Sequence, residues 1–255
     1  MKQAFGIDLV GQVALVTGGT RGLGKDIAAA LAAVGCAVVV CARNVADDLA
    51  AGIDFIASDI RDPEAAKALV DAVVARHGRI DILVNNAGGS PASAAEAASP
   101  RFIDAILKLN LIAPLYLAQA AHPHMVAQGG GSIVNIASVS GIRPSPGTAV
   151  YGSAKAGLLN LTQSLAQEWG PAGIRVNAII AGLMATESAE ATYGDAEAQA
   201  AVGRSMPLQR MGNGQDLAGA VLWLCSPLAA WVSGARINVD GGGERPYFLD
   251  LVKGE

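Results

Sequence analysis

Residues 13–34 read VALVTGGTRGLGKDIAAALAAV, and this stretch decides the fold that we expect. Val13–Thr17 is a short apolar run, typical of a strand buried on both faces. The glycine-rich turn Gly18–Gly24 follows it, and Lys25–Val34 is an alanine-rich helix candidate. A strand, a glycine turn and a helix N-terminus in this order form a phosphate cradle, because free amides and the helix dipole stabilise negative charge. The glycine spacing is not GxGxxG, so an ordinary glycine turn is the alternative.

The remaining chain alternates apolar strand candidates with helix candidates. We expect strands at Ala37–Cys41, Ile53–Ala57, Ile80–Val84, Ile133–Ala137, Ile174–Ile180 and Arg236–Val239. We expect helices at Pro63–His77, Pro100–Gln128, Tyr151–Trp169 and Asp216–Cys225. This alternation predicts an α/β fold in which helices cover both faces of a parallel sheet. No internal repeat or linker divides the chain, so we expect residues 1–255 to form a single domain.

Two segments depart from a regular helical pattern. Asn110 and Pro114 lie inside the helix candidate Pro100–Gln128, where a side-chain amide and a proline predict a break or kink. Residues 181–206 are alanine-rich, moderately polar and poorly periodic. We expect this segment to be a mobile lid over the functional edge of the sheet rather than a fixed core element.

Composition and charge exclude several classes of protein. Hydrophobic residues make up 52% of the chain and charged residues 16%, which argues against a disordered chain. The net charge is −4 and no run of Lys or Arg occurs, so we expect neither a nucleic acid nor a membrane as partner. The N-terminal MKQAFGIDLVGQ has no apolar core followed by a cleavage site, so it does not resemble a signal peptide. A cytoplasmic protein is expected.

The cysteines and histidines show no metal-binding pattern. Cys36, Cys41 and Cys225 form no CxxC, and they are expected to be reduced packing residues in a reducing compartment. His122 and His124 have no cysteine or carboxylate neighbours, so they are expected to be solvated or capping residues. We expect no metal site.

A second functional stretch, SVSGIRPSPGTAVYGSAK, spans Ser138–Lys155. Tyr151 and Lys155 are spaced i and i+4, so on one helix their side chains share a face. A neighbouring ammonium lowers the pKa of a phenol from about 10, which suits a general acid or base. Ser138 follows the run Ile133–Ala137, so its hydroxyl should lie at the carboxyl end of a buried strand, where it can hold a substrate oxygen. A surface helix pair is the alternative for the Tyr-x-x-x-Lys spacing alone.

Arg43 follows the second strand candidate, about 20 residues beyond the glycine turn. An acidic residue there would bind the ribose hydroxyl of NAD, whereas an arginine accepts the 2′-phosphate of NADP. Arg21, within the glycine turn, can reach the same phosphate, and no acid occurs in this region before Asp47. We therefore expect NADP(H), with NAD(H) as the alternative if both arginines are merely solvated.

Further motifs follow in order along the chain. They are TGGTRGLG (17–24), Asp59-Ile60, NNAG (85–88), Asn110, Ser138, YGSAK (151–155), RVNA (175–178) and VDGG (239–242). From about Leu9 to Gly242 the chain resembles the short-chain dehydrogenase/reductase family. The resemblance implies a single-domain Rossmann fold, with a doubly wound seven-stranded parallel sheet and a nicotinamide cofactor. Ala181-Gly182 replaces the usual Pro-Gly of the family, so we expect a freer start to the substrate loop.

The resemblance also implies roles for individual residues. Ser138 would orient the substrate carbonyl and Tyr151 would donate the proton. Lys155 would lower the pKa of the tyrosine and bind the nicotinamide ribose, while Asn110 would hold a water that relays protons. The implied cofactor residues are Gly18, Thr20, Arg21, Gly22, Leu23, Gly24, Arg43, Asp59, Ile60, Asn86, Ala87, Gly88, Tyr151, Lys155, Ala181, Gly182, Leu183 and Thr186. The expected substrate pocket comprises Ser138, Ser140, Ile142, Thr148, Tyr151, Leu183 and Met184.

The implied reaction interconverts a ketone and a secondary alcohol. The substrate would be a free ketone, sugar, cyclic alcohol or steroid, or a 3-oxoacyl thioester of a carrier protein or CoA. A carrier requires a basic docking patch, and only Arg175, Arg204 and Arg210 could converge to form one, so a free ketone is favoured. A catalytically idle NADP-binding sensor is the alternative from a different class, although the complete tetrad disfavours it.

Assembly is expected on the same resemblance. Members of the family pair two long helices, here about Pro100–Gln128 and Tyr151–Trp169, so a homotetramer is expected and a dimer is the alternative. The tail Arg245–Leu251 (RPYFLDL) carries aromatic residues. It would pack on a neighbouring subunit near the active site, or cover the edge of its own sheet.

Overall fold

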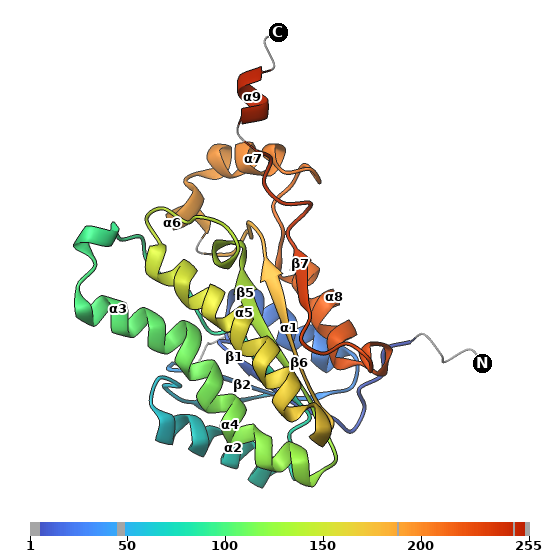
Figure 1. The fold of residues 1–255 in the computed structure, drawn as a ribbon. Coiled ribbons are helices and arrows are strands. Elements are labelled where there is room, and N and C mark those ends of the chain that lie inside the picture. Colours follow the sequence, from blue (N-terminus) through green and yellow to red (C-terminus); the bar gives the residue numbers. More distant parts are fainter. Residues whose placement is uncertain (1–5, 45–48, 188, 247, 253–255) are drawn as a thin grey trace.

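The computed structural model describes residues 6–44, 49–187, 189–246 and 248–252. Within these residues, seven parallel strands form one sheet in the order β3-β2-β1-β4-β5-β6-β7 (Figure 1). The strands are β1 Val13–Thr17, β2 Ala37–Ala42, β3 Ile53–Ala57, β4 Ile82–Asn85, β5 Gly131–Ser138, β6 Ile174–Ala181 and β7 Arg236–Val239. The predicted doubly wound parallel sheet is confirmed.

Helices cover both faces of this sheet. On one face lie α1 Gly22–Ala33 and α8 Gly214–Cys225, and on the other lie α2 Pro63–His77, α4 Ala113–Ala127 and α5 Ala149–Trp169 (Figure 1). Because both faces are covered, the central strands are buried throughout, and their sequences are nearly continuous apolar runs. Because all seven strands are parallel, their carboxyl ends meet at one edge of the sheet, where functional side chains can lie close together.

Helix α1 begins at Gly22, earlier than the predicted Lys25. Arg21 is its N-cap in an extended conformation, so the end of the glycine-rich turn forms the first turn of the helix. Gly18 has a φ of 64°, which side-chain-bearing residues rarely adopt. The first amides of α1, which have no partner within the helix, therefore belong to the glycine-rich turn itself.

The predicted disturbance near Asn110 is a π-helical turn, Lys108–Ile112, between α3 (Pro100–Leu107) and α4. Asn110 Nδ2 donates to the Ile106 carbonyl oxygen at 2.9 Å. A regular helix would give that oxygen to the backbone N–H of Asn110. The side chain thus competes with the helical ladder, which explains why the backbone widens at this residue.

Residues 181–206 follow β6 and contain two short helices, α6 (Ala189–Tyr193) and α7 (Ala196–Ser205). In Figure 1 both helices lie beyond the carboxyl ends of the strands. Met184 forms an isolated parallel bridge with Gly212, which ties the start of the segment to the chain before α8. The segment is more ordered than an irregular lid, and its mobility stays a prediction.

The three cysteines pack in the interior, as predicted. Cys36, Cys41 and Cys225 are free and buried. Burial raises the pKa of each thiol to about 12, because a thiolate is poorly solvated there. They are therefore protonated packing residues.

The helical stretch Pro100–Ala127 is long and apolar enough, by length and composition alone, to cross a membrane. Leu117, Ala121 and Met125 on this stretch are fully buried in the core, as in a soluble α/β domain. Only 33% of its most apolar window is buried within the chain, however. The absence of a membrane partner stays a prediction, and the outer face of this helix is available for another contact.

The C-terminal helix α9 (Phe248–Val252) stands clear of the body in Figure 1. Phe248, Leu251 and Val252 are exposed on it. The helix does not cover the edge of its own sheet, so this alternative for the tail is not what the structure shows. Tyr247, a further part of the predicted aromatic tail, lies outside the described residues.

Candidate active site

The strand order reverses between β1 and β4, and a crevice opens there at the carboxyl edge. Thr17 joins the two strands, because its hydroxyl accepts from the amides of Asn86 and Ala87 at 3.0 and 2.9 Å. Asn86 in turn donates from Nδ2 to the Thr17 carbonyl at 2.8 Å. A Cβ at Gly24 would lie 2.4 Å from Asn86 Nδ2, so glycine is required at this position. The glycine-rich turn and the NNAG motif form one rigid wall.

This wall borders a cavity of about 480 Å³, within the usual range for a cofactor site. Predicted cofactor residues that line it are Gly18, Thr20, Arg21, Gly22, Leu23, Gly24, Arg43, Asp59, Ile60, Asn86, Ala87, Gly88 and Thr186. The other predicted cofactor residues, Tyr151, Lys155, Ala181, Gly182 and Leu183, lie outside its lining. The residues present fit a dinucleotide, since backbone amides and arginines line one continuous space.

Arg61 also lines this cavity, although the sequence analysis did not identify it. Its guanidinium pairs with the carboxylate of Asp59, with Nε donating to Oδ1 at 2.8 Å. This hydrogen bond, together with the nearby charge of Arg43, lowers the pKa of Asp59. The carboxylate is thereby neutralised, and Arg21 and Arg43 remain as positive charges at the cavity wall. The only signal in the sequence was an arginine two residues beyond Asp59.

Glu187 is a second residue that the sequence analysis missed. It follows Thr186 in the lid segment, and its Oε1 accepts a hydrogen bond from the amide of Gly22 at 3.2 Å. A carboxylate therefore lies at the N-terminus of α1, where the helix dipole favours a negative charge. An anionic ligand in the cavity would compete with Glu187 for the same amide.

Ser138 and Tyr151 meet on the other side of the crevice. Ser138 ends β5, and Tyr151 lies in the first turn of α5, which begins at Ala149 rather than at the predicted Tyr151. The side chain of Ser138 acts to lower the pKa of the phenol. Burial acts in the opposite direction and dominates, so the pKa of Tyr151 is raised above its ordinary value. The expectation that Lys155 lowers this pKa is therefore not met in the structure.

The geometry of Lys155 explains this difference. Its side chain is almost fully buried, and Nζ donates to the Ile136 carbonyl at 2.8 Å. Nζ lies 5.6 Å from the centroid of the Tyr151 ring, over the ring face. Burial lowers the pKa of Lys155 itself to about 8, because the ammonium loses solvation. Lys155 thus lies beside Tyr151 as predicted, but its ammonium loses a proton more readily than that of an exposed lysine.

Asn110 and Lys155 converge on the NNAG motif. Asn110 is fully buried, and its side chain exchanges two hydrogen bonds with the backbone of Gly89, at 2.9 and 3.0 Å. A Cβ on Gly88 would lie 2.7 Å from Asn110 Oδ1 and 3.2 Å from Lys155 Nζ. The structure therefore brings together the four residues of the predicted tetrad, with Asn110 and Lys155 at this loop and Tyr151 between Lys155 and Ser138. It also gives Asn110 an anchoring contact that the sequence did not predict.

Tyr193 on α6 is a further residue near the phenol of Tyr151. The charge of a Tyr193 phenolate would oppose ionisation of Tyr151, which helps to raise the pKa of Tyr151. The pKa of Tyr193 is raised as well, mainly by burial and also by the charge of Glu244. Arg143, which follows β5, pairs with Glu244, which follows β7. A lid tyrosine and an ion pair thus border the site, and neither was identified from the sequence.

The predicted substrate residues divide into two groups. Ser140 and Thr148 join a hydroxyl cluster through Ser145, whose Oγ lies 3.1 Å from Ser140 Oγ and 2.6 Å from Thr148 Oγ1. Ile142 is half exposed beside this cluster. Met184 instead packs in the core behind the lid, and Leu183 joins it in lining a separate cavity of about 290 Å³. That cavity does not include Ser138 or Tyr151.

The three arginines considered for a carrier patch do not converge. Arg175 pairs in register with Ser132 near the amino end of β6, at the opposite edge of the sheet from Ser138. Arg210 forms a bidentate ion pair with Asp216, with nitrogen–oxygen distances of 2.6 and 2.7 Å. Arg204 lies in the last turn of α7. No single basic surface is formed by these residues.

Comparison with known proteins decides the family. The family described as enoyl-(acyl carrier protein) reductase matches residues 18–244. Probable galactose dehydrogenase GalD of Rhizobium meliloti (strain 1021) is 36% identical over 245 residues, which cover 92% of this chain and 96% of that protein. The chain belongs to the short-chain dehydrogenase/reductase family. This agrees with the resemblance carried by its motifs.

Other members show how wide the family is. A 3-oxoacyl-[acyl-carrier-protein] reductase of Synechocystis sp. (strain ATCC 27184 / PCC 6803 / Kazusa) is 36% identical over 245 residues, covering 92% of this chain and 97% of that protein. The crystal structure of a putative short-chain alcohol dehydrogenase from Sinorhizobium meliloti 1021 is 38% identical, with a TM-score of 0.87. It covers 92% of this chain and 97% of that chain. This short-chain dehydrogenase/reductase is therefore an oxidoreductase that uses a nicotinamide cofactor, NAD or NADP, and acts on a small molecule.

Proposed function

We propose that this enzyme is an NADP(H)-dependent oxidoreductase that interconverts a ketone and a secondary alcohol, with Tyr151 as the general acid/base. The observation that carries the proposal is the meeting of Ser138, Tyr151 and Lys155 at the end of β5. The Ser138 side chain lies close enough to the phenol to lower its pKa, and the buried ammonium lies 5.6 Å from the phenol ring centroid. Such a group can protonate an oxygen that gains negative charge.

The raised pKa of Tyr151 suits the reductive direction. A phenol that stays protonated is available to donate its proton when the carbonyl oxygen becomes an alkoxide. Ser138 lies beside that phenol, so its hydroxyl can orient the same oxygen. A bound nicotinamide supplies the hydride for the carbonyl carbon in reduction and accepts it in oxidation. Lys155 lies over the face of the phenol ring, and Asn110 holds the Gly88–Gly89 backbone beside Lys155.

The preference for NADP(H) rests on charge. Asp59 is paired with Arg61, while Arg21 and Arg43 lie on the cavity wall and form no ion pair with a carboxylate among the described residues. Two guanidiniums favour a ligand with an additional phosphate, because each forms charge-assisted hydrogen bonds with phosphate oxygens. The remaining predicted residues, from Ala181 to Thr186, would hold the nicotinamide end beneath the lid.

A free ketone is favoured over a carrier-bound thioester, because Arg175, Arg204 and Arg210 do not form a basic surface. The test is to follow NADPH absorbance with a panel of cyclic ketones, diketones, keto sugars, steroids and a 3-oxoacyl thioester. Turnover of at least one free ketone is expected. Turnover of the thioester alone would favour the carrier reductase. Tight NADPH binding with no turnover of any compound would favour a sensor.

The assembly proposed is a homotetramer, in a cytoplasmic location. The stretch Pro100–Ala127 supports it, since it is apolar by composition and only 33% of its most apolar window is buried within the single chain. A second copy would bury such a face. Light scattering should give four times the mass of the chain, and a monomeric mass at micromolar concentration would refute the assembly.

A further inference from the structure

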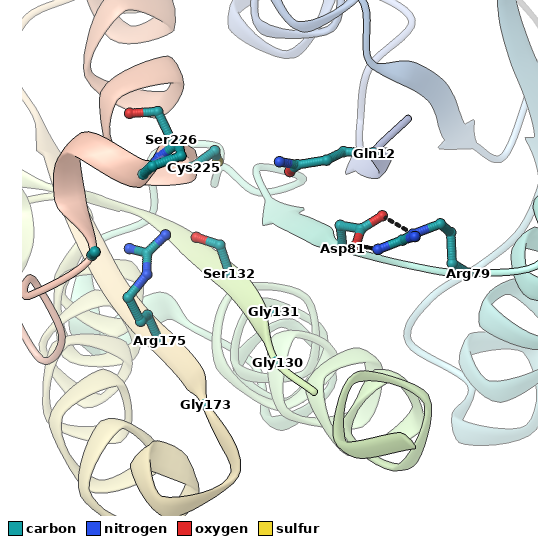
Figure 2. Close-up of a pocket in the computed structure, with 12 residues that line it drawn as sticks. Gln12, Arg79, Asp81, Gly130, Gly131, Ser132, Gly173, Arg175, Cys225 and Ser226 are labelled. Atoms are coloured by element: carbon teal, nitrogen blue, oxygen red, sulfur yellow. Dashed lines mark hydrogen bonds and ion pairs between the residues drawn. The ribbon is translucent and has the colours of Figure 1, made fainter. Parts of the chain in front are cut away.

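A second cavity, of about 280 Å³, lies at the amino-terminal edge of the sheet (Figure 2). It is formed by the residues that begin β4, β5 and β6 and by the chain that follows α8. Arg175 and Ser132 line it, and they are paired near the start of β6 and β5, whereas Ala181 is paired with the catalytic Ser138. At a rise of ~3.3 Å per residue, the two ends of β6 are about 20 Å apart. The cavity is therefore separate from the active site.

The one carboxylate that lines this cavity is already satisfied. Arg79 donates to Asp81 from Nε at 2.8 Å and from Nη2 at 2.6 Å. The amide of Val13 and the side chain of Gln128 donate to the same carboxylate, at 2.8 and 3.2 Å. Four donors thus occupy its two oxygens, and Arg79 balances its charge. Figure 2 shows this pair at one side of the cavity. Asp81 is therefore not available to accept hydrogen bonds from Arg175 or to balance its charge.

Arg175 carries the unbalanced charge. Its guanidinium is partly buried and donates one long hydrogen bond, from Nη1 to the Val232 carbonyl at 3.4 Å. No ion pair to it is found among the described residues. Burial lowers its pKa, which shows that the cation is poorly solvated. A guanidinium has five N–H donors in a planar fork that fits an oxyanion, so most of its donors are unused.

A neutral donor, the side chain of Gln12, faces the same space. In Figure 2 the hydroxyl of Ser132 lies beside the Arg175 guanidinium, but it already donates to the Leu224 carbonyl at 3.3 Å. The side-chain amide of Gln12 reaches in from the opposite wall. The side-chain amide of Gln12 makes no hydrogen bond with another of the described residues. An uncompensated cation and a free amide donor around a small polar space form a site for a compact anion.

We propose that this cavity binds a small oxyanion, a carboxylate or phosphate group of a free small molecule, through Arg175 and Gln12. The volume is near the lower limit for ligand pockets, so it admits a small ligand and excludes a dinucleotide. Bound anion would supply the charge that Arg175 lacks within the chain. The site is thus a second ligand site on the enzyme, at the edge of the sheet opposite the cofactor.

Isothermal titration with inorganic phosphate, and separately with malonate, tests the proposal. The enzyme is kept saturated with NADPH at constant ionic strength, so that the dinucleotide cavity does not contribute. One saturable site per chain is expected, and Arg175→Gln should weaken it by at least about tenfold. Arg236→Gln is the matched control, because Arg236 lies on the neighbouring strand β7 and bonds Gln163. It should leave binding unchanged.

Two further results keep the test decisive. If Arg175→Gln does not fold, Gln12→Ala should weaken binding severalfold, and unchanged affinity in that variant would overturn the proposal. Equal, non-saturating responses in every variant would show a general ion effect, which also overturns it. The proposal is also overturned if the wild type binds neither anion. Arg175→Gln would then be expected to lower the oligomer mass measured by light scattering. In that case a carboxylate of a second copy fills the cavity.

Discussion

The two halves of the carboxyl edge are built in different ways. The nucleotide half, around β1, β2 and α1, presents backbone amides and exposed arginines to its cavity. The catalytic half, around β5 and α5, presents side chains that are buried in the domain, with Lys155 and Asn110 exposed by only 3% and 0%. Substitutions should therefore adjust affinity in the first half and abolish chemistry or alter stability in the second.

The largest effect is expected for Tyr151→Phe in the catalytic half. Loss of the proton donor should lower kcat by about 10²- to 10⁴-fold. NADPH affinity, measured by fluorescence titration, should change little, because the ring remains in place. Tyr193→Phe is the matched control, since its phenol is near that of Tyr151, and it should retain most of the activity. Comparable losses in both variants would contradict the assignment of Tyr151 as the acid.

Lys155→Met should change the pH dependence of stability. In the wild type, the pKa of Lys155 falls from 10.5 to about 8 on folding, so the unfolded chain binds an additional proton between these values. The free energy of unfolding of the wild type should therefore rise with pH in this window, by about 3 kcal/mol relative to Lys155→Met. Urea denaturation from pH 7.5 to 10 measures the difference. Parallel curves for the two proteins would exclude this titration.

Arg43→Asp should alter cofactor choice in the nucleotide half. Removing a guanidinium and adding a carboxylate weakens the 2′-phosphate contact, so NADPH affinity should fall by about 10- to 100-fold while NADH affinity rises. Dissociation constants for both cofactors give the ratio directly. An unchanged ratio would show that Arg43 is only a solvated surface residue, and the comparison between the two halves would lose its electrostatic basis.

Glu187→Gln should produce the smallest effect. The variant removes the negative charge that now accepts from the Gly22 amide, so cofactor affinity should increase by about two- to fivefold. Glu190→Gln, an exposed glutamate on α6, is the matched control and should leave affinity unchanged. Weaker NADPH binding in Glu187→Gln would mean that Glu187 supports the bound cofactor instead of competing with it.

The sequence predicted the parts of the molecule that local pattern determines. The strands, the glycine-rich turn and the break at Asn110 depend on apolar runs, glycine and a side-chain amide, and the structure has them within a few residues. Contacts between distant segments were not predictable. Glu187 meets Gly22, and Tyr193 approaches Tyr151, only because the lid folds over the sheet. The predicted lowering of the pKa of Tyr151 was wrong for the same reason, since burial depends on the whole fold and raises this pKa.

Hydride transfer to a carbonyl carbon is the central claim, and an α,β-unsaturated cyclic ketone tests it most directly. Such a compound offers a carbonyl group and a carbon–carbon double bond within one molecule. The enzyme would be supplied with NADPH deuterated at the transferring position of the nicotinamide, and the product analysed by mass spectrometry and NMR. Deuterium on the carbon that bears the new hydroxyl group is predicted. Deuterium on the β-carbon, with the carbonyl intact, would contradict the account and indicate an enoyl reductase.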